Sequence, residues 1–293
     1  MRFTVSFLTV SIVLADRDEL SHTVTSAHPH KHKVLQKLRL RYRSKFFNSI
    51  LLIFILQCDT ELSFADTAAT LPHEFSAHYK LTRGIITLGK THLSFKKLNA
   101  REYQFESVSK PQGVGKIISN GQIQERSIWI LYDNTLRPLR YTYQNSDSDL
   151  KRDVRLDFDW DKGIVVNNIN GDPWKMKLEP ATQDKLLYML SLMVDLAKGK
   201  RHLEYRVADG GTTKTYLAII NGIEIIDTDL GRFQTLKVLR KHHDGRKTIL
   251  WSASSLEFIP IQIEQIKKDG TSVKARIYQL DGIPIRGRIA GKN

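Results

Sequence analysis

The chain has 293 residues, a formal net charge of +14 and a single cysteine, Cys58. With one cysteine it can form no internal disulfide, and a zinc site built on several cysteines is excluded. The positive charge is spread singly or in pairs along the chain, and no nucleic-acid-binding motif accompanies it, so we expect no nucleic-acid partner.

The first 65 residues have the layout of a secretory signal. A cluster of Lys and Arg at 31–45 precedes an apolar run at 46–56, and Ser63-Phe64-Ala65 places small residues where a signal peptidase cleaves. The apolar run is too short to span a bilayer. We therefore predict an N-terminal extension with a secretory signal over residues 1–65 and a single β domain over residues 66–293.

This layout predicts a periplasmic protein whose mature chain has no transmembrane span. Two alternatives stay open. The apolar run could be retained as a membrane anchor, or Cys58 could be a lipidation site, although such sites have a small residue before the cysteine and Gln57 is large and polar. Because the signal begins about thirty residues after Met1, which is unusual, the true start could lie further downstream.

After residue 65, pairs of turn-forming residues recur about every eight to twelve positions. Between these pairs, apolar and polar residues alternate: Phe75, Ala77 and Tyr79 fall on one face of a strand, and Ser76 and His78 on the other. Alternation of this kind indicates strands with one buried and one solvated face. The turn pairs include Arg83-Gly84, Asn120-Gly121, Asn170-Gly171, Asn221-Gly222, Asp244-Gly245 and Asp269-Gly270.

The pattern predicts a mainly β fold, a large curved antiparallel sheet that forms a closed or half-open barrel. Closure or near closure follows from the number of consecutive strands, since it removes exposed edges. We expect strands near residues 73–81, 85–95, 101–109, 113–119, 122–132, 137–145, 152–160, 163–169, 173–178, 203–208, 214–220, 222–228, 232–240, 246–253, 257–268 and 271–279.

One apolar segment departs from the alternation and predicts a single buried helix near residues 184–198. Its Leu and Met residues recur at helical spacing, Asp184 is placed as an N-cap, and Gly199 can end the helix. A helix that is apolar around most of its circumference must be buried on several sides. If the sheet encloses a cavity, the candidate cavity-lining residues are Leu187, Leu190, Met193 and Val194.

The sequence predicts no catalytic, cofactor-binding or metal site. Asp157, Asp159 and Asp161 superficially resemble a calcium loop, but the glycine that follows them is misplaced and they fall on the solvated face of a strand. His242 and His243 are adjacent, so on a strand they point to opposite faces and cannot share one ion. No Gly-x-Ser-x-Gly motif of a serine hydrolase occurs.

Several short motifs occur along the predicted β domain. They are Phe75-x-Ala-x-Tyr79 followed by Gly84 and Gly89, Asp184 before the apolar helix, Asp229-Leu230-Gly231-Arg232-Phe233, Trp251-Ser252, Pro260-Ile261-Gln262-Ile263 and Asp269-Gly270. With these motifs the chain resembles the exported bacterial proteins of domain-of-unknown-function family 3108. The resemblance covers residues 72–282 and implies a periplasmic β protein with no settled activity and no catalytic residues to carry over.

Our leading hypothesis is a non-enzymatic periplasmic β domain that binds an apolar or amphiphilic ligand, or an envelope partner such as a lipid, on its concave face. One alternative is an envelope hydrolase acting on lipid or glycan, which requires a cleft with converging carboxylates or histidines. Another is an envelope assembly or scaffold protein, which would show an exposed apolar patch or an unpaired sheet edge. The sequence predicts no oligomeric state.

Overall fold

The computed structural model describes residues 4–5, 10–11, 71–147 and 151–290. The predicted secretory signal, with Cys58, therefore lies outside the described residues, and of the predicted N-terminal extension only one pair of short strands is described. These are β1 (Thr4–Val5) and β2 (Val10–Ser11), which pair with each other. In the part of the chain that the structure describes, no helix is both long enough and apolar enough to cross a bilayer.

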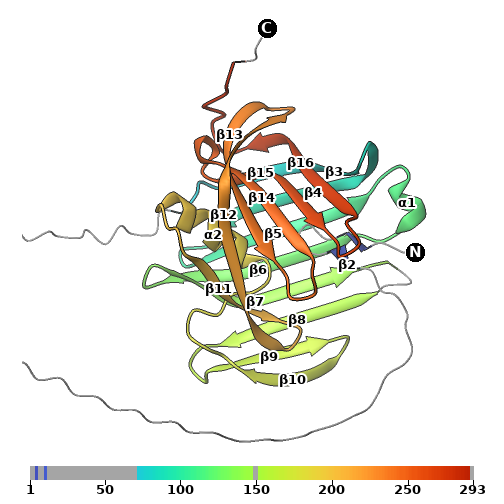
Figure 1. Cartoon of the computed structure of the whole chain (residues 1–293). Helices are drawn as coiled ribbons and strands as arrows, with labels where there is room; N and C mark the ends of the chain where they lie inside the picture. Colours follow the sequence, from blue (N-terminus) through green and yellow to red (C-terminus); the bar gives the residue numbers. More distant parts are fainter. Residues whose placement is uncertain (1–3, 6–9, 12–70, 148–150, 291–293) are drawn as a thin grey trace, which may run out of the picture. The chain divides into compact units, whose positions relative to one another are not determined.

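The strands after residue 71 form one antiparallel sheet of fourteen strands within the described region (Figure 1). They are β3 (Phe75–Arg83), β4 (Ile86–Lys97), β5 (Glu102–Pro111), β6 (Ile123–Tyr132), β7 (Thr135–Asn145), β8 (Arg152–Asp159), β9 (Ile164–Ile169), β10 (Asp172–Lys177), β11 (Leu203–Asp209), β12 (Thr212–Thr228), β13 (Gly231–Lys241), β14 (Lys247–Ala253), β15 (Ile259–Ile266) and β16 (Ser272–Asp281). The helical elements are α1 (Gly115–Ile118), α2 (Leu187–Ala197) and the short 3₁₀ helix η1 (Ser254–Leu256).

The order of the strands confirms the predicted curved antiparallel sheet and shows that it is open. Consecutive strands pair from β3 to β10 and again from β11 to β16. The two halves are joined in the middle of the sheet, where β3 pairs with β16, and β10 and β11 do not pair with each other but form its two edges. The segment between these edges covers part of β11, because the Gln183 amide donates to the Arg206 carbonyl (2.7 Å) and the Ala208 amide to the Gln183 carbonyl (2.9 Å). Covering an edge in this way removes a site of unwanted strand pairing.

The strand predictions are wrong in two places, which involve three of the predicted strands. The strand predicted at 113–119 is the helical turn α1, whose Gly115 lies so close to β4 that a Cβ atom there would sit 1.7 Å from the Leu88 carbonyl oxygen. The strands predicted at 214–220 and 222–228 are one strand, β12, and Asn221-Gly222 forms a bulge in it instead of a hairpin turn. Gly222 has φ +97°, a conformation that serves bulges as well as turns.

The predicted buried helix is confirmed as α2, and the interior of the curved sheet is packed around it. The Asp184 carboxylate accepts hydrogen bonds from the amides of Leu186 (2.8 Å) and Leu187 (2.7 Å), which satisfies donors that the helix itself leaves free. In α2, every side chain from Leu187 to Val194 is buried. The helix packs against β7 and β11 and belongs to one continuous hydrophobic core.

Candidate interaction surface

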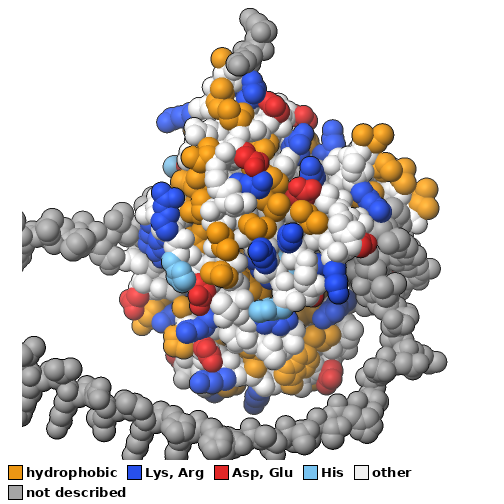
Figure 2. All heavy atoms as spheres, in the orientation of Figure 1, with side chains coloured by type: hydrophobic (Ala, Val, Ile, Leu, Met, Phe, Trp, Pro, Cys, Tyr) orange, Lys and Arg blue, Asp and Glu red, His pale blue; other side chains and the backbone are white. Residues whose placement is uncertain are grey.

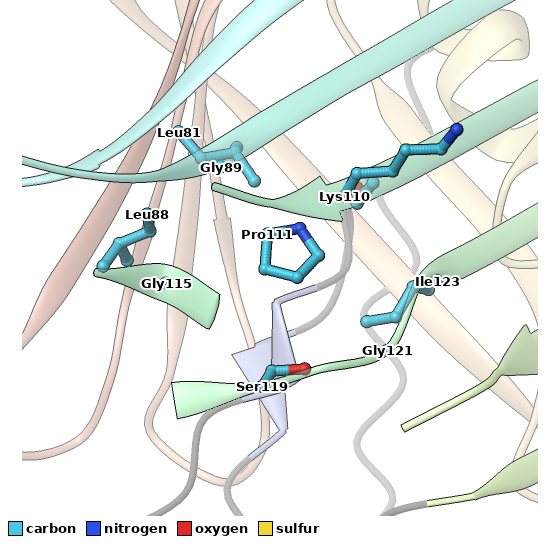
Figure 3. A pocket seen from close by; sticks show the side chains of 10 residues that line it. Leu81, Leu88, Gly89, Lys110, Pro111, Gly115, Ser119, Gly121 and Ile123 are labelled. Atoms are coloured by element: carbon cyan, nitrogen blue, oxygen red, sulfur yellow. The ribbon is translucent and has the colours of Figure 1, made fainter. Parts of the chain in front are cut away.

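The structure places the candidate cavity-lining residues in the packed core. Leu187, Leu190, Met193 and Val194 are all buried, and the first three belong to the main hydrophobic cluster. None of them lines the surface pocket of Figure 3. Their role as ligand contacts stays a prediction, and the concave face on which we expected a ligand is occupied by α2.

The pocket lies at the ends of β3, β4 and β5, under α1, with a volume of about 410 Å³ that includes space open to solvent (Figure 3). Leu88, Pro111 and Ile123 line it together with several glycines. Among the described residues that line it, Lys110 is the charged one, and its side chain extends away from the pocket (Figure 3). The described lining includes no carboxyl or imidazole group, the groups that general acid–base catalysis most often uses.

A cluster of buried polar side chains lies between β6, β7 and the start of α2. The Ser127 hydroxyl donates to Asp184 Oδ2 (2.5 Å), and the Tyr141 hydroxyl donates to Glu125 Oε2 (2.8 Å). Burial raises the pKa of Asp184 to about 6, and the charge of Glu125 adds to the rise, against the lowering effect of the hydrogen bonds to Asp184. Two carboxylates therefore converge as a hydrolase requires, but both are buried and neither lines the pocket.

Asp157 and Asp159 of β8 form ion pairs on the outer face, as the strand pattern predicts. Asp157 contacts Arg140 (2.7 Å) and Arg155 (2.6 Å), and Asp159 contacts Lys162 (2.8 Å). Each carboxylate thus has a cation of the chain as its partner. Among the described residues, no three His, Cys, Asp or Glu side chains are grouped as a metal site would need.

The two adjacent histidines also have separate environments. His242 is partly buried and its Nε2 lies 2.8 Å from the Thr248 hydroxyl, whereas His243 is exposed. Burial is the main reason that the pKa of His242 falls to about 4, with the nearby charges of Arg240 and Arg246 adding to it. His242 is therefore a neutral structural residue at neutral pH.

A row of four basic side chains crosses the outer face of four neighbouring strands. The strand register places Lys110 directly opposite Lys90, Lys90 opposite Lys80, and Lys80 opposite Arg276. All four are exposed. Because neighbouring strands lie about 4.8 Å apart, this basic row, as we call these four residues, extends over about 14 Å perpendicular to the strands.

The basic row does not stabilise the sheet. Like charges placed directly opposite each other on neighbouring strands are destabilising, and among the described residues none of Lys80, Lys90 and Lys110 has an ion-pair partner. Arg276 donates from Nε (2.9 Å) and Nη2 (2.7 Å) to Gln262 Oε1, which is a neutral group. The positive charge of the row is therefore available to an anion from outside the chain.

Aromatic and imidazole rings lie beside the basic row on the same face. His78 and His92 are directly opposite each other with their rings stacked 4.6 Å apart, and Ser76 Oγ lies 2.7 Å from His92 Nε2. The Lys90 amine sits 5.1 Å from the centre of the Tyr278 ring. Burial, together with the charge of His78, lowers the pKa of His92 against the opposing effect of Glu106, so acidification adds positive charge next to the row.

A patch of apolar side chains occupies the same outer face over β12, β13 and β14. Leu217 and Ile219 are 46% and 48% exposed. Ile219 lies directly opposite Leu239, and Leu239 opposite Ile249. We call these four residues the apolar patch. Figure 2 shows apolar side chains gathered over β12 and β13 with Lys and Arg side chains around them. Outward positions of an antiparallel sheet are ordinarily polar.

Together these features define a β-barrel-like protein, an open antiparallel meander wrapped around one buried helix, with charged and apolar surfaces on the outside of the sheet. The chain belongs to the family described as "Protein of unknown function (DUF3108)", whose model matches residues 74–278. This confirms the family suggested by the sequence motifs. No curated protein matches the chain.

A similar solved structure is the beta-barrel-like protein of domain of unknown function DUF1849 from Brucella abortus. The two chains are 12% identical with a TM-score of 0.51, and the match covers 72% of this chain and 98% of the other. At this level of identity the likeness shows the fold alone. It supports the β-barrel-like architecture and leaves the function to be argued from the surface.

Proposed function

We propose that the β domain is an exported, non-enzymatic binding module that holds an anionic component of the cell envelope on its outer face. The observation that carries the proposal is the basic row, in which four uncompensated cations stand side by side. A row that costs stability and pairs with no acid among the described residues is explained if an external anion completes it.

Two further observations support a surface function over a ligand enclosed by the sheet. The concave side is filled by α2, so a ligand there would have to displace the helix from the core. The outer face, in contrast, presents its charges without rearrangement. Export is supported by the signal layout of residues 1–65, and the basic excess of the chain suits the anionic polymers and lipids of an envelope.

We expect the purified domain to bind inorganic polyphosphate, used as a soluble polyanion, with an affinity that falls as salt concentration rises. The double variant K80Q/K90Q removes the two central charges of the row and should weaken binding at least tenfold. Each lysine that contacts a phosphate releases a counterion bound to the polyanion, and this favourable release is lost together with the contact. Isothermal titration calorimetry at several salt concentrations would measure both the affinity and its salt dependence.

The matched control is K175Q/K177Q, which removes the same charge from exposed positions of β10 at the edge of the sheet. It should bind polyphosphate within about twofold of the wild type, because it leaves the row intact. Equal weakening by both double variants would show that net charge alone drives the binding, and the row would then have no special role. No binding by the wild type would refute the proposal directly.

A further inference from the structure

We infer that the anionic component is the surface of a lipid bilayer, with the apolar patch entering the interfacial region while the basic row contacts head-group phosphates. This inference rests on the proposed function. Its basis is that aliphatic and basic side chains occupy one continuous outer face. An amphiphile can contact both kinds of side chain, whereas a purely hydrophilic polymer has no apolar group to contact the aliphatic ones.

The strand order places the two features close together. The apolar patch ends on β14 with Ile249, and the basic row begins on β16 with Arg276, so a single strand separates them. At about 4.8 Å per strand, Arg276 and Lys80 lie about 10–15 Å from Ile249 measured perpendicular to the strands, with an offset of two residues along them. This separation is short enough for one bilayer surface to contact the patch and the near end of the row together.

A cross-strand register joins the two features as well. Gln262 lies directly opposite Arg276, Trp251 opposite Gln262, and Lys237 opposite Trp251. One line of paired residues therefore connects the end of the basic row to β13 and β14, two strands of the patch. Glu224 neutralises Lys237 at a distance of 2.7 Å, and accepts a hydrogen bond from Trp251 Nε1 at 2.6 Å. Among the described residues, cations with no ion-pair partner therefore lie beside the patch in two places. The basic row lies beyond β15, and Lys241 lies directly opposite Lys247, two residues along the strands from Leu239 and Ile249.

The bulge in β12 provides a control within the same strand. Ile223 and Ile225 are as exposed as the patch residues, at 59% and 50%. Because of the bulge, Ile223 pairs with Leu236, whereas Ile219 pairs with Leu239. Leu236 and Leu239 are three residues apart on the regular strand β13, an odd number, so their side chains point to opposite faces. Because successive side chains alternate between faces, Ile223 and Ile225 lie on the opposite face from Ile219.

The test compares two double variants of the full β domain with the wild type. L217S/I219S removes aliphatic groups from the apolar patch, and I223S/I225S removes equally exposed groups from the opposite face. Binding is measured by cosedimentation with vesicles of phosphatidylglycerol and phosphatidylcholine, with vesicles of phosphatidylcholine alone, and by calorimetry with inorganic polyphosphate. Urea unfolding of each variant establishes that it is folded.

We expect L217S/I219S to bind phosphatidylglycerol vesicles at least tenfold more weakly than the wild type while its affinity for polyphosphate stays within twofold. I223S/I225S should match the wild type with both probes. If L217S/I219S binds vesicles as well as the wild type does, the bilayer inference is wrong, although the basic row could still bind a hydrophilic polyanion. If polyphosphate binding is also absent in the wild type, the proposed function itself fails.

Discussion

Leu190→Ala in α2 is expected to lower the free energy of unfolding by about 2–5 kcal/mol, the range for truncating a fully buried leucine. Leu190 has 0% exposure and lies in a helix whose side chains are buried on every side. The cost should fall at the upper part of that range. The surrounding strands are held in register by hydrogen bonds and cannot collapse into the vacated space, so a cavity remains.

Urea unfolding followed by tryptophan fluorescence would measure this loss, with Leu217→Ala as the control. Leu217→Ala removes the same side-chain volume at a position that is 46% exposed. It should change the free energy of unfolding by no more than about 0.5 kcal/mol. A similar small effect of both substitutions would mean that α2 is not an integral part of the core, and the concave face would again be open to a ligand.

Much of the fold could be predicted from the sequence because its signals are local. Alternating residues such as Phe75, Ala77 and Tyr79 mark a strand with one buried face, and the apolar run behind Asp184 marks the helix. The errors come from residue pairs that are equally compatible with two different local structures. Asn221-Gly222 tolerates the positive φ of a hairpin turn and equally that of a bulge, and only the pairing of β12 with β13 distinguishes them.

The candidate surface could not be predicted from the sequence, since it depends on the register between strands distant in sequence. Lys80 and Lys90 belong to one hairpin, and a symmetric count about its turn at Gly84-Ile85 pairs Lys80 with Gly89. The bulge at Leu81 and Thr82 shifts this pairing by one residue to Lys90, and the sequence does not mark that bulge. Arg276, however, joins the row through the pairing of β3 with β16, the first and last strands of the sheet in sequence, which no local pattern indicates. In sequence, these lysines and arginines look like the charges of any solvated face.

The position of the helix explains why function is better placed outside the sheet than inside it. A half-open sheet of this length leaves an interior that must be filled, and here α2 fills it with side chains of the same chain. Where α2 packs against it, the inner face of the sheet contributes to stability. The outer face carries the basic row and the exposed aliphatic residues Leu217 and Ile219.

Asp184 is the residue through which we expect pH to act on this core. Its folded-state pKa of about 6 is higher than the ordinary value of 3.8, so the folded protein holds the proton more tightly than the unfolded chain does. The stability linked to Asp184 is thus fully present below pH 4 and is lost as the pH rises through 6. The shift corresponds to about 3 kcal/mol over this interval.

The variant D184N isolates this effect, because an amide can still accept from the amides of Leu186 and Leu187 and can donate to Ser127, but it does not titrate. Relative to the wild type, D184N should become more stable by about 3 kcal/mol between about pH 4 and pH 6.5. Taking the difference between the two proteins at each pH cancels the contributions of all other titrating groups.

His242→Gln is the matched comparison because it should show the opposite trend. The pKa of His242 is lowered to about 4 from 6.5, so the folded protein resists protonation and the wild type loses stability as the pH falls through this interval. Relative to the wild type, H242Q should therefore gain stability on acidification, whereas D184N gains it as the pH rises. A difference between D184N and the wild type that stayed constant from pH 4 to 6.5 would show that Asp184 keeps its ordinary pKa, and that the polar cluster beneath α2 is open to water.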